Sequence, residues 1–326
     1  MPTQPLVSVV IPTYNRAGII GETIENVFQQ TYPNIELIVV DDGSTDGTVS
    51  LLKSYGNRIR WAVQENAGPA AARNRGIAMA EGEIVAFQDS DDAWHPTKIA
   101  RQVSLLERAG KSVTCCICNM IMELPGVVGR SFDAAGLRPG IEEGIWPNVT
   151  EVLATRFLMF NQAAAVRREV LVRIGGFDES FRLMEDGELG LRLSLEGPWA
   201  FIREPLATRQ DKLARTLGHE ATVLKVSTYD VMMRERVLQM IASEPRFHSL
   251  RPLMERELRR ARRNLRAAQI GDSKVLGASV AAWCWQQLER YRLAVERRMP
   301  RFPRMKVMPL DPQGFRVEES ADCVIV

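Results

Sequence analysis

Short apolar runs alternate with segments of helical periodicity along the first 120 residues of the chain. Most of the runs are rich in β-branched residues and stop at a proline or a polar turn, and apolar residues at helical spacing follow them. The predicted strands are residues 6–11, 35–40, 59–63, 84–87 and 113–118. Because strands and helices alternate with short connections, we expect an α/β fold: an open, mostly parallel, doubly wound sheet with helices on both faces.

The pattern changes after residue 120. Glycines and prolines interrupt residues 121–160, so we expect loops there, lying over the substrate. Residues 162–166 are predicted to form a strand and residues 168–174 a short helix, and the leucines after Met184 predict another helix that begins with Glu185 and Asp186. Beyond His219 the periodicity is helical, with helices expected from residue 223, over 250–268 and over 275–295.

Three polar clusters directly follow predicted strands. They are Thr13-Tyr14-Asn15, Asp41-Asp42-Gly43 and Asp89-Ser90-Asp91. The carboxyl ends of parallel strands share one edge of a sheet, and ligands of open α/β folds bind at this edge. Each cluster alone has a structural explanation, as a turn or a solvated acidic loop. Together they favour a site for a nucleotide-type ligand.

The phosphates of such a ligand need a binding group. The sequence contains no Gly-x-x-x-x-Gly-Lys-Ser/Thr loop, and no Gly-x-Gly-x-x-Gly motif follows the first strand, so the phosphate cradles of P-loop enzymes and dinucleotide dehydrogenases are missing. A divalent ion on Asp91 could hold the phosphates instead. Mg²⁺ and Mn²⁺ bind few carboxylates and take their remaining ligands from phosphate oxygens and water.

The composition is that of a soluble globular protein. The chain has 326 residues, of which 45% are apolar and 25% charged. Three of its five cysteines, Cys115, Cys116 and Cys118, lie in an apolar run rather than at metal-ligand spacing, so we expect reduced core thiols in a cytosolic protein. The first residues lack a signal-peptide pattern and no run of 18 apolar residues occurs, so we expect neither export nor a membrane span.

Four motifs occur in a fixed order along the chain. They are Val9-Val10-Ile11-Pro12-Thr13-Tyr14-Asn15, Val39-Val40-Asp41-Asp42-Gly43-Ser44-Thr45-Asp46, Asn66-Ala67-Gly68-Pro69-Ala70-Ala71-Ala72-Arg73-Asn74-Arg75-Gly76 and Asp89-Ser90-Asp91-Asp92. In this order they resemble the signature of family 2 glycosyltransferases, whose fold is the GT-A type. The resemblance covers residues 6–210 and does not extend into the C-terminal region.

The resemblance implies a binding role for each motif. Pro12, Thr13 and Tyr14 would line the base pocket, and Asp42 would accept a hydrogen bond from the base. Arg73 would contact the nucleotide, Asp89 the ribose or the metal's water shell, and Ser90 would be a further donor-binding residue. Asp91 would bind Mg²⁺ or Mn²⁺ on the diphosphate, with Asp89 as a second ligand, and Arg209 would reach the diphosphate. An aromatic ring and a carboxylate suit a uracil-like base.

Simpler roles exist for some of these side chains. Tyr14 could only pack, Arg73 could pair with a carboxylate on the rim, and Arg209 could be an ordinary surface arginine.

The Glu185-Asp186 pair resembles the family's site of the general base. An inverting transfer needs its base on the sugar face opposite the leaving diphosphate, so a carboxylate on a separate element suits the chemistry. We assign the base to Asp186 rather than Glu185, although the helix dipole alone would account for one of them. The family more often has aspartate where this chain has Glu188, which leaves the acceptor type open.

The resemblance therefore predicts a metal-dependent, inverting glycosyltransferase of cell-surface polysaccharide or glycoconjugate synthesis. It would transfer a sugar from a nucleotide diphosphate, with a UDP-sugar favoured, to a hydroxyl of a glycan or lipid-linked acceptor. Residues 1–215 would be the GT-A catalytic domain, with a nucleotide-binding half (1–120) and an acceptor half (121–215). A basic helical region (216–307) and an irregular tail (308–326) would follow. The alternatives are a nucleotidyltransferase and a noncatalytic scaffold that binds sugar nucleotides or glycans.

The C-terminal region carries most of the positive charge. Residues 245–306 hold sixteen Lys and Arg against five Asp and Glu, a formal +11, which leaves −9 elsewhere for the overall +2. Such a surface is usually solvated, but basic helices with an apolar side at Trp283, Trp285, Leu288 and Leu293 could also lie on an anionic membrane. We expect a cytoplasmic protein, peripheral at the inner face of the membrane in the second case. No nucleic-acid motif accompanies the charge, so we expect no nucleic-acid partner.

Overall fold

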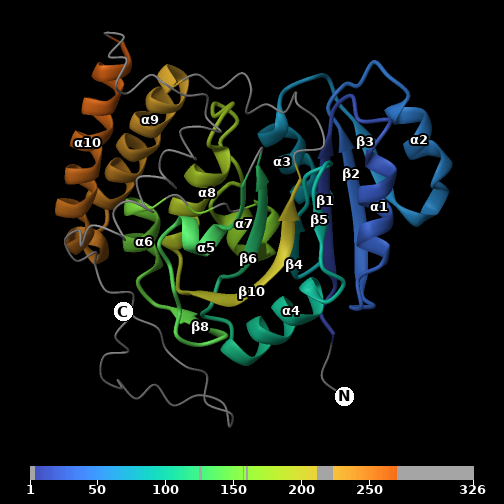
Figure 1. Ribbon diagram of the computed structural model, residues 1–326, viewed down its shortest axis with the longest axis horizontal. Coiled ribbons are helices and arrows are strands. Elements are labelled where there is room, and N and C mark those ends of the chain that lie inside the picture. The colour runs from blue at the N-terminus through green and yellow to red at the C-terminus, as the bar shows by residue number, and fades with distance from the viewer. Residues whose placement is uncertain (1–3, 125–126, 157, 159–160, 211–222, 270–326) are drawn as a thin grey trace.

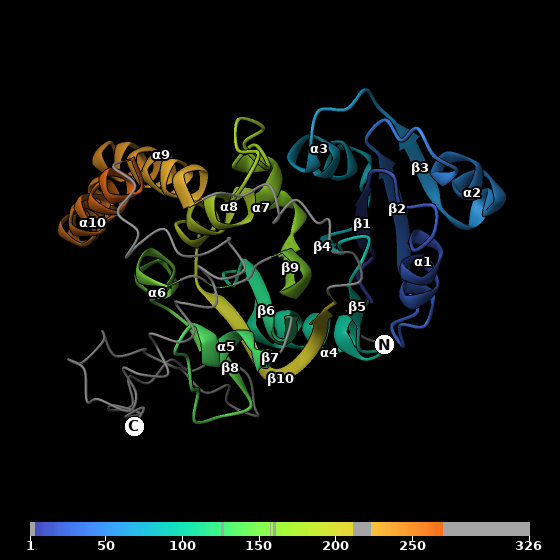
Figure 2. The same ribbon diagram turned by 45° about the horizontal axis from the view of Figure 1, so that its top comes forward.

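The computed structural model describes residues 4–124, 127–156, 158, 161–210 and 223–269. They form one curled sheet with helices on both faces, and two long helices pack at one end of this body (Figure 1, Figure 2). The strands are β1 (Val7–Thr13), β2 (Ile35–Asp41), β3 (Arg60–Val63), β4 (Ile84–Phe87), β5 (Ala93–Trp94), β6 (Cys115–Leu124), β7 (Val127–Arg130), β8 (Glu143–Trp146), β9 (Ala164–Arg167) and β10 (Trp199–Arg209).

The helices are α1 (Ile20–Phe28), α2 (Thr48–Ser54), α3 (Pro69–Met79), α4 (Lys98–Ala109), α5 (Ser131–Ala134), α6 (Val149–Thr155), α7 (Arg168–Arg173), α8 (Glu185–Ser194), α9 (Val223–Ala242) and α10 (Arg251–Gln269). Short 3-10 turns lie at Gly56–Arg58, Asn161–Ala163 and Pro245–Leu250.

The first four strands form the parallel sheet that the sequence predicts. β1 pairs with β2 on one side and β4 on the other, and β3 pairs with β2, all in parallel. The register sets Thr13 opposite Asp41 and Val10 opposite Phe87. The carboxyl ends of β1, β2 and β4 therefore lie at one edge of the sheet.

Beyond β4 the sheet becomes mixed. β9 lies between β4 and β6 and is antiparallel to both, so β6 keeps the direction of the first four strands. β10 is parallel to β6, and the short strands β5 and β8 are antiparallel to β10. The predicted α/β sheet is thus confirmed, with antiparallel strands in its second half, of which β9 corresponds to the strand predicted over residues 162–166.

Two parts of this second half differ from the prediction. Residues 121–160 are not a run of loops, since they contain the end of β6 and all of β7, α5, β8 and α6. Most of the glycines and prolines there lie between short elements. β10 is not indicated by the pattern at all, because Arg203, Glu204 and Pro205 interrupt its apolar run and the pairing with β6 shifts register at Pro205.

Apolar layers on both faces of the sheet hold the helices in place. Successive residues of β1 point to opposite layers, so that Val9 belongs to one cluster and Val10 to the other. Cys115, Cys116 and Cys118 of β6 are fully buried free thiols, as predicted, and burial raises the pKa of all three.

Helices α9 and α10 are joined to the sheet domain by a separate apolar cluster. Met233, Val237 and Ile241 of α9 pack in it with Leu191 and Leu195 of α8. The helices predicted from residue 223 and over 250–268 are therefore confirmed. The predicted helix 275–295, with its tryptophans, and the tail 308–326 lie outside the described residues. None of the described helices is both long enough and apolar enough to cross a membrane.

Candidate active site

Three polar loops leave the sheet side by side where β1, β2 and β4 end. The N–H of Asp42 donates to the carbonyl of Thr13 at 2.8 Å, and the N–H of Gln88 donates to the carbonyl of Val10 at 3.0 Å. These bonds continue the strand pairing into the loops. The polar clusters that follow the three strands therefore meet on one rim, as the topology predicts.

The predicted base pocket contains an exposed ring beside a buried hydroxyl. Tyr14 is 44% exposed, so its ring is available to a ligand and is not a core packing element. Pro12 and Thr13 are buried in β1, and the Oγ1 atom of Thr13 has no hydrogen-bond partner among the residues that the structure describes. A buried hydroxyl without a partner is rare and points to a ligand group or a water at this place.

Asp42 already has a structural role. Its Oδ1 accepts hydrogen bonds from Gln64 Nε2 at 2.8 Å and from the N–H of Ala67 at 2.9 Å, and its Oδ2 accepts one from the N–H of Gly68 at 2.8 Å. The carboxylate therefore orders the loop that begins α3. A contact with a base would add to these three bonds, since a carboxylate has about four acceptor positions.

Arg73 of α3 joins two loops that are far apart in sequence. Its Nη2 lies 2.7 Å from Asp89 Oδ1 and its Nη1 lies 2.9 Å from Glu185 Oε1. Burial lowers the pKa of Arg73, but the two carboxylates outweigh burial and raise it. The pairing with rim carboxylates, which the sequence left as an alternative for Arg73, is thus present in the structure.

Helix α3 lies unusually close to β1. A Cβ atom at Gly76 would lie 2.2 Å from Cγ1 of Val10, so a larger residue here would push the helix away from the strand.

Three carboxylates crowd the loop after β4. Gln162 donates from its Nε2 to Asp89 Oδ2 and to Asp92 Oδ2. Burial, followed by the charges of Asp89 and Asp91, raises the pKa of Asp92 well above its ordinary value. Gln162 therefore holds two of the three acidic side chains together. No sequence motif indicates this role, because Gln162 is only the polar residue before an apolar strand.

Asp91 is the least engaged carboxylate of the group. Its Oδ2 lies 4.0 Å from Arg16 Nη2, and burial followed by the charge of Asp89 raises its pKa. Ser90 is buried, and its carbonyl accepts a 2.8 Å hydrogen bond from Thr23 of α1, which anchors the loop. A mostly buried carboxylate whose nearest described ion-pair partner lies 4.0 Å away is favourable for binding a cation.

The donor set fits a hard divalent ion shared with a ligand. No group of three His, Cys, Asp or Glu side chains that could hold a metal occurs within the described part of the chain. Mg²⁺ does not need such a group, since one or two carboxylates and the phosphates of a substrate suffice. Asp91 fits this arrangement better than Asp89, because Arg73 and Gln162 already occupy the two oxygens of Asp89.

Helix α8 brings two further carboxylates to the rim. Met184, just before the helix, has φ 61°, and this left-handed residue turns the chain so that Glu185 and Asp186 begin the first turn. Asp186 is partly buried, and its Oδ1 accepts a 2.8 Å hydrogen bond from the N–H of Gly187. Burial, followed by the charge of Glu185, raises the pKa of Asp186 to about 7. Such a carboxyl group can take up and release a proton near neutral pH.

The end of β10 completes the rim. The N–H of Gln210 donates to Asp92 Oδ1 at 3.0 Å. The charge of Arg209 offsets part of the rise in the pKa of Asp91 and Asp92, so Arg209 faces the acidic loop. The contacts of Gln210 and Arg16 with this loop are not indicated by the sequence, since both depend on the sheet topology.

The comparisons with known proteins indicate a family and a fold. A family model described as glycosyl transferase family 2 matches residues 8–165. An uncharacterised glycosyltransferase of Rickettsia prowazekii is 40% identical over 218 residues, which cover 65% of this chain and 66% of that protein. The putative teichuronic acid biosynthesis glycosyltransferase TuaG of Bacillus subtilis is 43% identical over 111 residues, 32% of this chain and 44% of that protein. This chain thus spans less than two thirds of the length of these relatives.

Solved structures share the fold at low sequence identity. A mannosyltransferase of Pyrobaculum calidifontis in complex with GDP-Man and Mn²⁺ superposes with a TM-score of 0.57 at 22% identity, covering 90% of this chain and 81% of the other. Residues 1–349 of S. aureus TarS in complex with UDP-GlcNAc give a TM-score of 0.56 at 16% identity, covering 96% and 99%. The predicted GT-A fold is confirmed.

Proposed function

Since the chain belongs to glycosyl transferase family 2 through residues 8–165, we propose that it transfers a sugar, with inversion, from a nucleotide diphosphate to an acceptor hydroxyl. The observation that supports this most directly is the bridge made by Arg73. It joins Asp89 of the acidic loop to Glu185, the neighbour of Asp186. A candidate site for the diphosphate and a candidate base therefore lie on two sides of one rim, as displacement at a sugar carbon requires.

The donor we favour is a UDP-sugar. Tyr14 would stack on the base, and the partnerless Thr13 hydroxyl and the Asp42 carboxylate would offer hydrogen bonds to its edge. TarS binds UDP-GlcNAc, whereas the mannosyltransferase binds GDP-Man, so the fold accommodates both bases. Arg209 and the Ser90 loop lie on the side where the diphosphate would sit.

Mg²⁺ or Mn²⁺ would be held by Asp91, with Asp89 next to it. A bound ion would neutralise charge on the departing diphosphate. Residues of the chain position this candidate metal site. Gln162 holds Asp89 and Asp92 through hydrogen bonds, and Arg16, at 4.0 Å, is too far from Asp91 to compensate its charge fully. The Mn²⁺ in the mannosyltransferase complex supports a divalent ion in a protein of this fold.

In the proposed reaction, Asp186 acts as the general base. Its carboxylate accepts the proton of the acceptor hydroxyl while the hydroxyl oxygen bonds to the anomeric carbon. The bond from that carbon to the diphosphate oxygen breaks, and its electron pair leaves with the nucleoside diphosphate. Arg73 keeps Glu185 paired, so that Asp186 is the carboxylate of the first turn that remains for this step.

The acceptor we propose is a hydroxyl of a glycan or of a lipid-linked saccharide in cell-surface polysaccharide synthesis. The similarity to the teichuronic acid enzyme supports this class. Residues 121–215 would form the acceptor half, after a nucleotide-binding half of residues 1–120. Residues 216–307 would form the basic helical region. We place the reaction in the cytoplasm, where the free thiols of Cys115, Cys116 and Cys118 would stay reduced.

A screen of nucleotide sugars tests the proposal. The full chain, incubated with Mn²⁺ and each UDP- or GDP-sugar, is expected to release free nucleoside diphosphate. Release of pyrophosphate would support the nucleotidyltransferase alternative. Donor binding without turnover, with every acceptor class offered, would support the noncatalytic scaffold.

We expect kcat/KM to rise with pH and to level off above about 7, because burial and Glu185 raise the pKa of Asp186 to about 7. The base acts only as a carboxylate, so protonation below this pKa removes it. Rates of nucleoside diphosphate release between about pH 5.5 and 8.5 at constant ionic strength measure the acidic limb. A limb near the ordinary aspartate value of about 4 would contradict the raised pKa.

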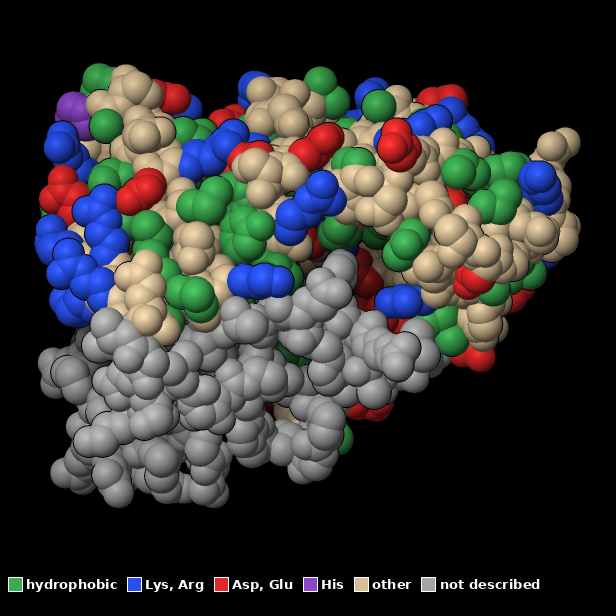
Figure 3. Space-filling view, turned by 90° about the horizontal axis from the view of Figure 1, so that it is seen from above, with side chains coloured by type: hydrophobic (Ala, Val, Ile, Leu, Met, Phe, Trp, Pro, Cys, Tyr) green, Lys and Arg blue, Asp and Glu red, His purple; other side chains and the backbone are tan. Residues whose placement is uncertain are grey.

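We also propose that α10 contacts anionic lipid. Arginines gather on the exposed side of α10, at the left of Figure 3. Arg263 and Arg266 lie farther along the helix than its acidic residues Glu255 and Glu257, which form ion pairs with Arg251 and Arg260. These two arginines are therefore the best placed to contact lipid phosphates. Each arginine near an anionic surface contributes about 1 kcal/mol, so replacing both with alanine is expected to weaken binding roughly 30-fold.

Cosedimentation with vesicles of phosphatidylglycerol and phosphatidylcholine measures this effect. The control replaces Arg101 and Arg108 of α4, which pair with Glu204 and Glu143 on another part of the surface. Vesicle binding that does not weaken as the salt concentration rises would contradict contact through α10. An equal loss of binding in the Arg263/Arg266 variant and in the Arg101/Arg108 control would also contradict it.

A further inference from the structure

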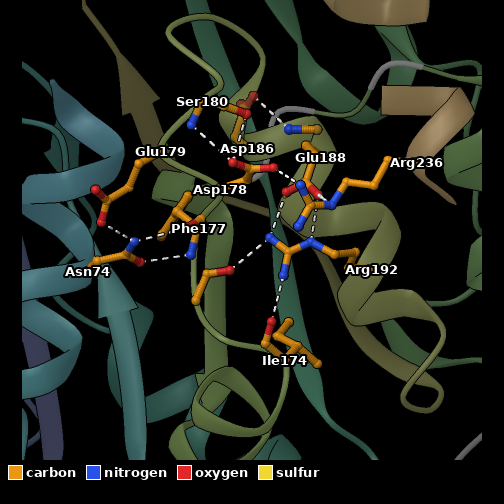
Figure 4. Close-up of polar contacts among 12 residues, drawn as sticks. Asn74, Ile174, Phe177, Asp178, Glu179, Ser180, Asp186, Glu188, Arg192 and Arg236 are labelled. Carbon is orange, nitrogen blue, oxygen red and sulfur yellow. Dashed lines mark hydrogen bonds and ion pairs between the residues drawn. The ribbon is translucent and has the colours of Figure 1, made fainter. Parts of the chain in front are cut away.

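An arginine of α9 contacts the helix that carries the candidate base. Arg236 pairs through Nη1 with Asp178 Oδ2, and its Nε lies 3.3 Å from Glu188 Oε1 (Figure 4). Glu188 is fully buried in the first turn of α8, two residues after Asp186. One guanidinium thus links α9 both to α8 and to the loop that precedes it.

A second arginine completes a network of balanced charge, in which Glu188 and Arg192 are buried and Arg236 is about half exposed. Arg192 donates from Nε and Nη2 to the two oxygens of Glu188, each at 2.6 Å. Its Nη1 also donates to the carbonyl of Ile174 at 2.9 Å, and its Nη2 to the carbonyl of Gly176 at 2.7 Å. Two arginines therefore face two carboxylates, those of Glu188 and Asp178. Removing the charge of Arg236 takes one ion pair from the mostly buried Asp178 and leaves the buried Glu188 with Arg192.

The loop before α8 is also tied to the nucleotide-binding half. Asn74 of α3 donates to the carbonyl of Phe177 and to Glu179 Oε1, both at 2.9 Å, and accepts from the N–H of Phe177 at 2.7 Å. Asp178, which lies between these two residues, is the one that Arg236 contacts (Figure 4). The loop is therefore held from α3 on one side and from α9 on the other.

Close packing adds to the polar contacts. A Cβ atom at Gly187 would lie 3.6 Å from Sδ of Met233, so α9 lies directly against the first turn of α8. Gly187 is the residue whose N–H donates to Asp186. A shift of α9 would therefore act on the backbone beside Asp186.

We propose that Arg236 is a positioning residue for Asp186, and that α9 is part of the catalytic unit. This inference rests on the proposed function, because it takes Asp186 as the base. Glu188 is on the same helical turn as Asp186. The contact with Arg236 therefore restrains the position of that turn along the helix axis and its rotation about the axis. Displacement of a catalytic group by 1 Å can cost about 100-fold in rate.

The test compares Arg236→Met with a matched control in the full chain. Arg236→Met is expected to lower kcat roughly 10- to 100-fold, with the KM for the donor changed less than about twofold, because donor binding lies in the other half. Loss of a nearby positive charge is expected to move the acidic limb of kcat/KM to higher pH. The control is Arg262→Met, which removes another ion pair of the C-terminal helices, Arg262 Nη2 to Glu235 Oε1 at 2.7 Å, away from α8. It is expected to leave kcat and the limb unchanged.

Amide hydrogen exchange supplies a readout that does not need activity. Exchange in residues 178–188 is expected to speed up in Arg236→Met and not in Arg262→Met. Arg236→Lys keeps the charge, so it is expected to restore the acidic limb and part of kcat. If Arg236→Met does not fold, Arg236→Lys and Asp178→Asn are measured in the same way, and Asp178→Asn is expected to lower kcat and speed exchange.

Several results would overturn the inference. One is an unchanged kcat with unchanged exchange in residues 178–188. Another is an equal loss of kcat in Arg262→Met, which would mean that the helices act through stability alone. A wild-type chain without transferase activity would instead refute the proposed function, and the exchange data would still decide whether Arg236 orders α8.

Discussion

Replacement of Asp186 by asparagine is expected to lower kcat by about 10²- to 10⁴-fold, the range typical for loss of a general base, with donor affinity changed less than about twofold. Asparagine has nearly the shape of aspartate and can still accept the hydrogen bond from the N–H of Gly187, so the helix should keep its conformation. It cannot take up a proton. Steady-state kinetics with a saturating acceptor, together with calorimetric titration of the donor, measure the two quantities.

Glu185→Gln is the control, because it changes the neighbouring carboxylate in the same way. Glu185 is paired with Arg73, so its replacement should alter the alignment of α3 and α8 and lower the rate less. Full activity of Asp186→Asn would falsify the assignment of the base. Loss of activity in Glu185→Gln alone would transfer that role to Glu185.

The second large effect is expected at Asp91. Asp91→Asn should remove the dependence of donor binding on Mn²⁺ and lower kcat/KM roughly 10³-fold, since stabilising the charge of the leaving group contributes several kcal/mol. The physical reason is that this mostly buried carboxylate lies 4.0 Å from Arg16 Nη2, a distance too long for a strong ion pair, so a bound cation would compensate its charge better. Thermal shift with UDP, with and without Mn²⁺ and after EDTA treatment, checks binding independently of turnover.

Asp133→Asn on α5 is the matched control. Asp133 is an exposed carboxylate outside the Asp89–Asp92 loop and should leave the Mn²⁺ response unchanged. If Asp91→Asn retained the full Mn²⁺-dependent shift, a metal site at Asp91 would be excluded.

The nucleotide-binding half could be predicted from sequence because each of its elements has a local signal. β1, β2 and β4 are apolar runs that end at Thr13, Asp41 and Phe87, and α1 buries a regular apolar stripe. The second half has weaker local signals. β10 is interrupted at Pro205, and β9 joins the sheet only through strands that are far away in the sequence. Such pairing depends on the whole fold and leaves no periodicity of its own.

The candidate site could be predicted in part for the same reason. The acidic motif at Asp91 and the pair at Asp186 are recognisable in the sequence itself. The partners that hold them, such as Gln162 and Arg236, are single polar residues on distant elements. Arg236 in particular looks like one of many C-terminal arginines, and only the packing of α9 on α8 gives it a distinct role.

The close approach of α3 to β1 at Gly76 has a consequence for how acceptor range can change. From this one helix Arg73 extends to Asp89 and Glu185, and Asn74 holds the backbone at Phe177. The spacing between the donor-binding motifs and the proton acceptor is thus set by a rigid spacer. Within residues 127–156, α6 packs against α8, and Thr150 Oγ1 donates to the carbonyl of Ser194 at 3.0 Å. We expect exchanges in residues 127–148, which precede α6, to change the acceptor range of the proposed enzyme while the reacting groups keep their separation.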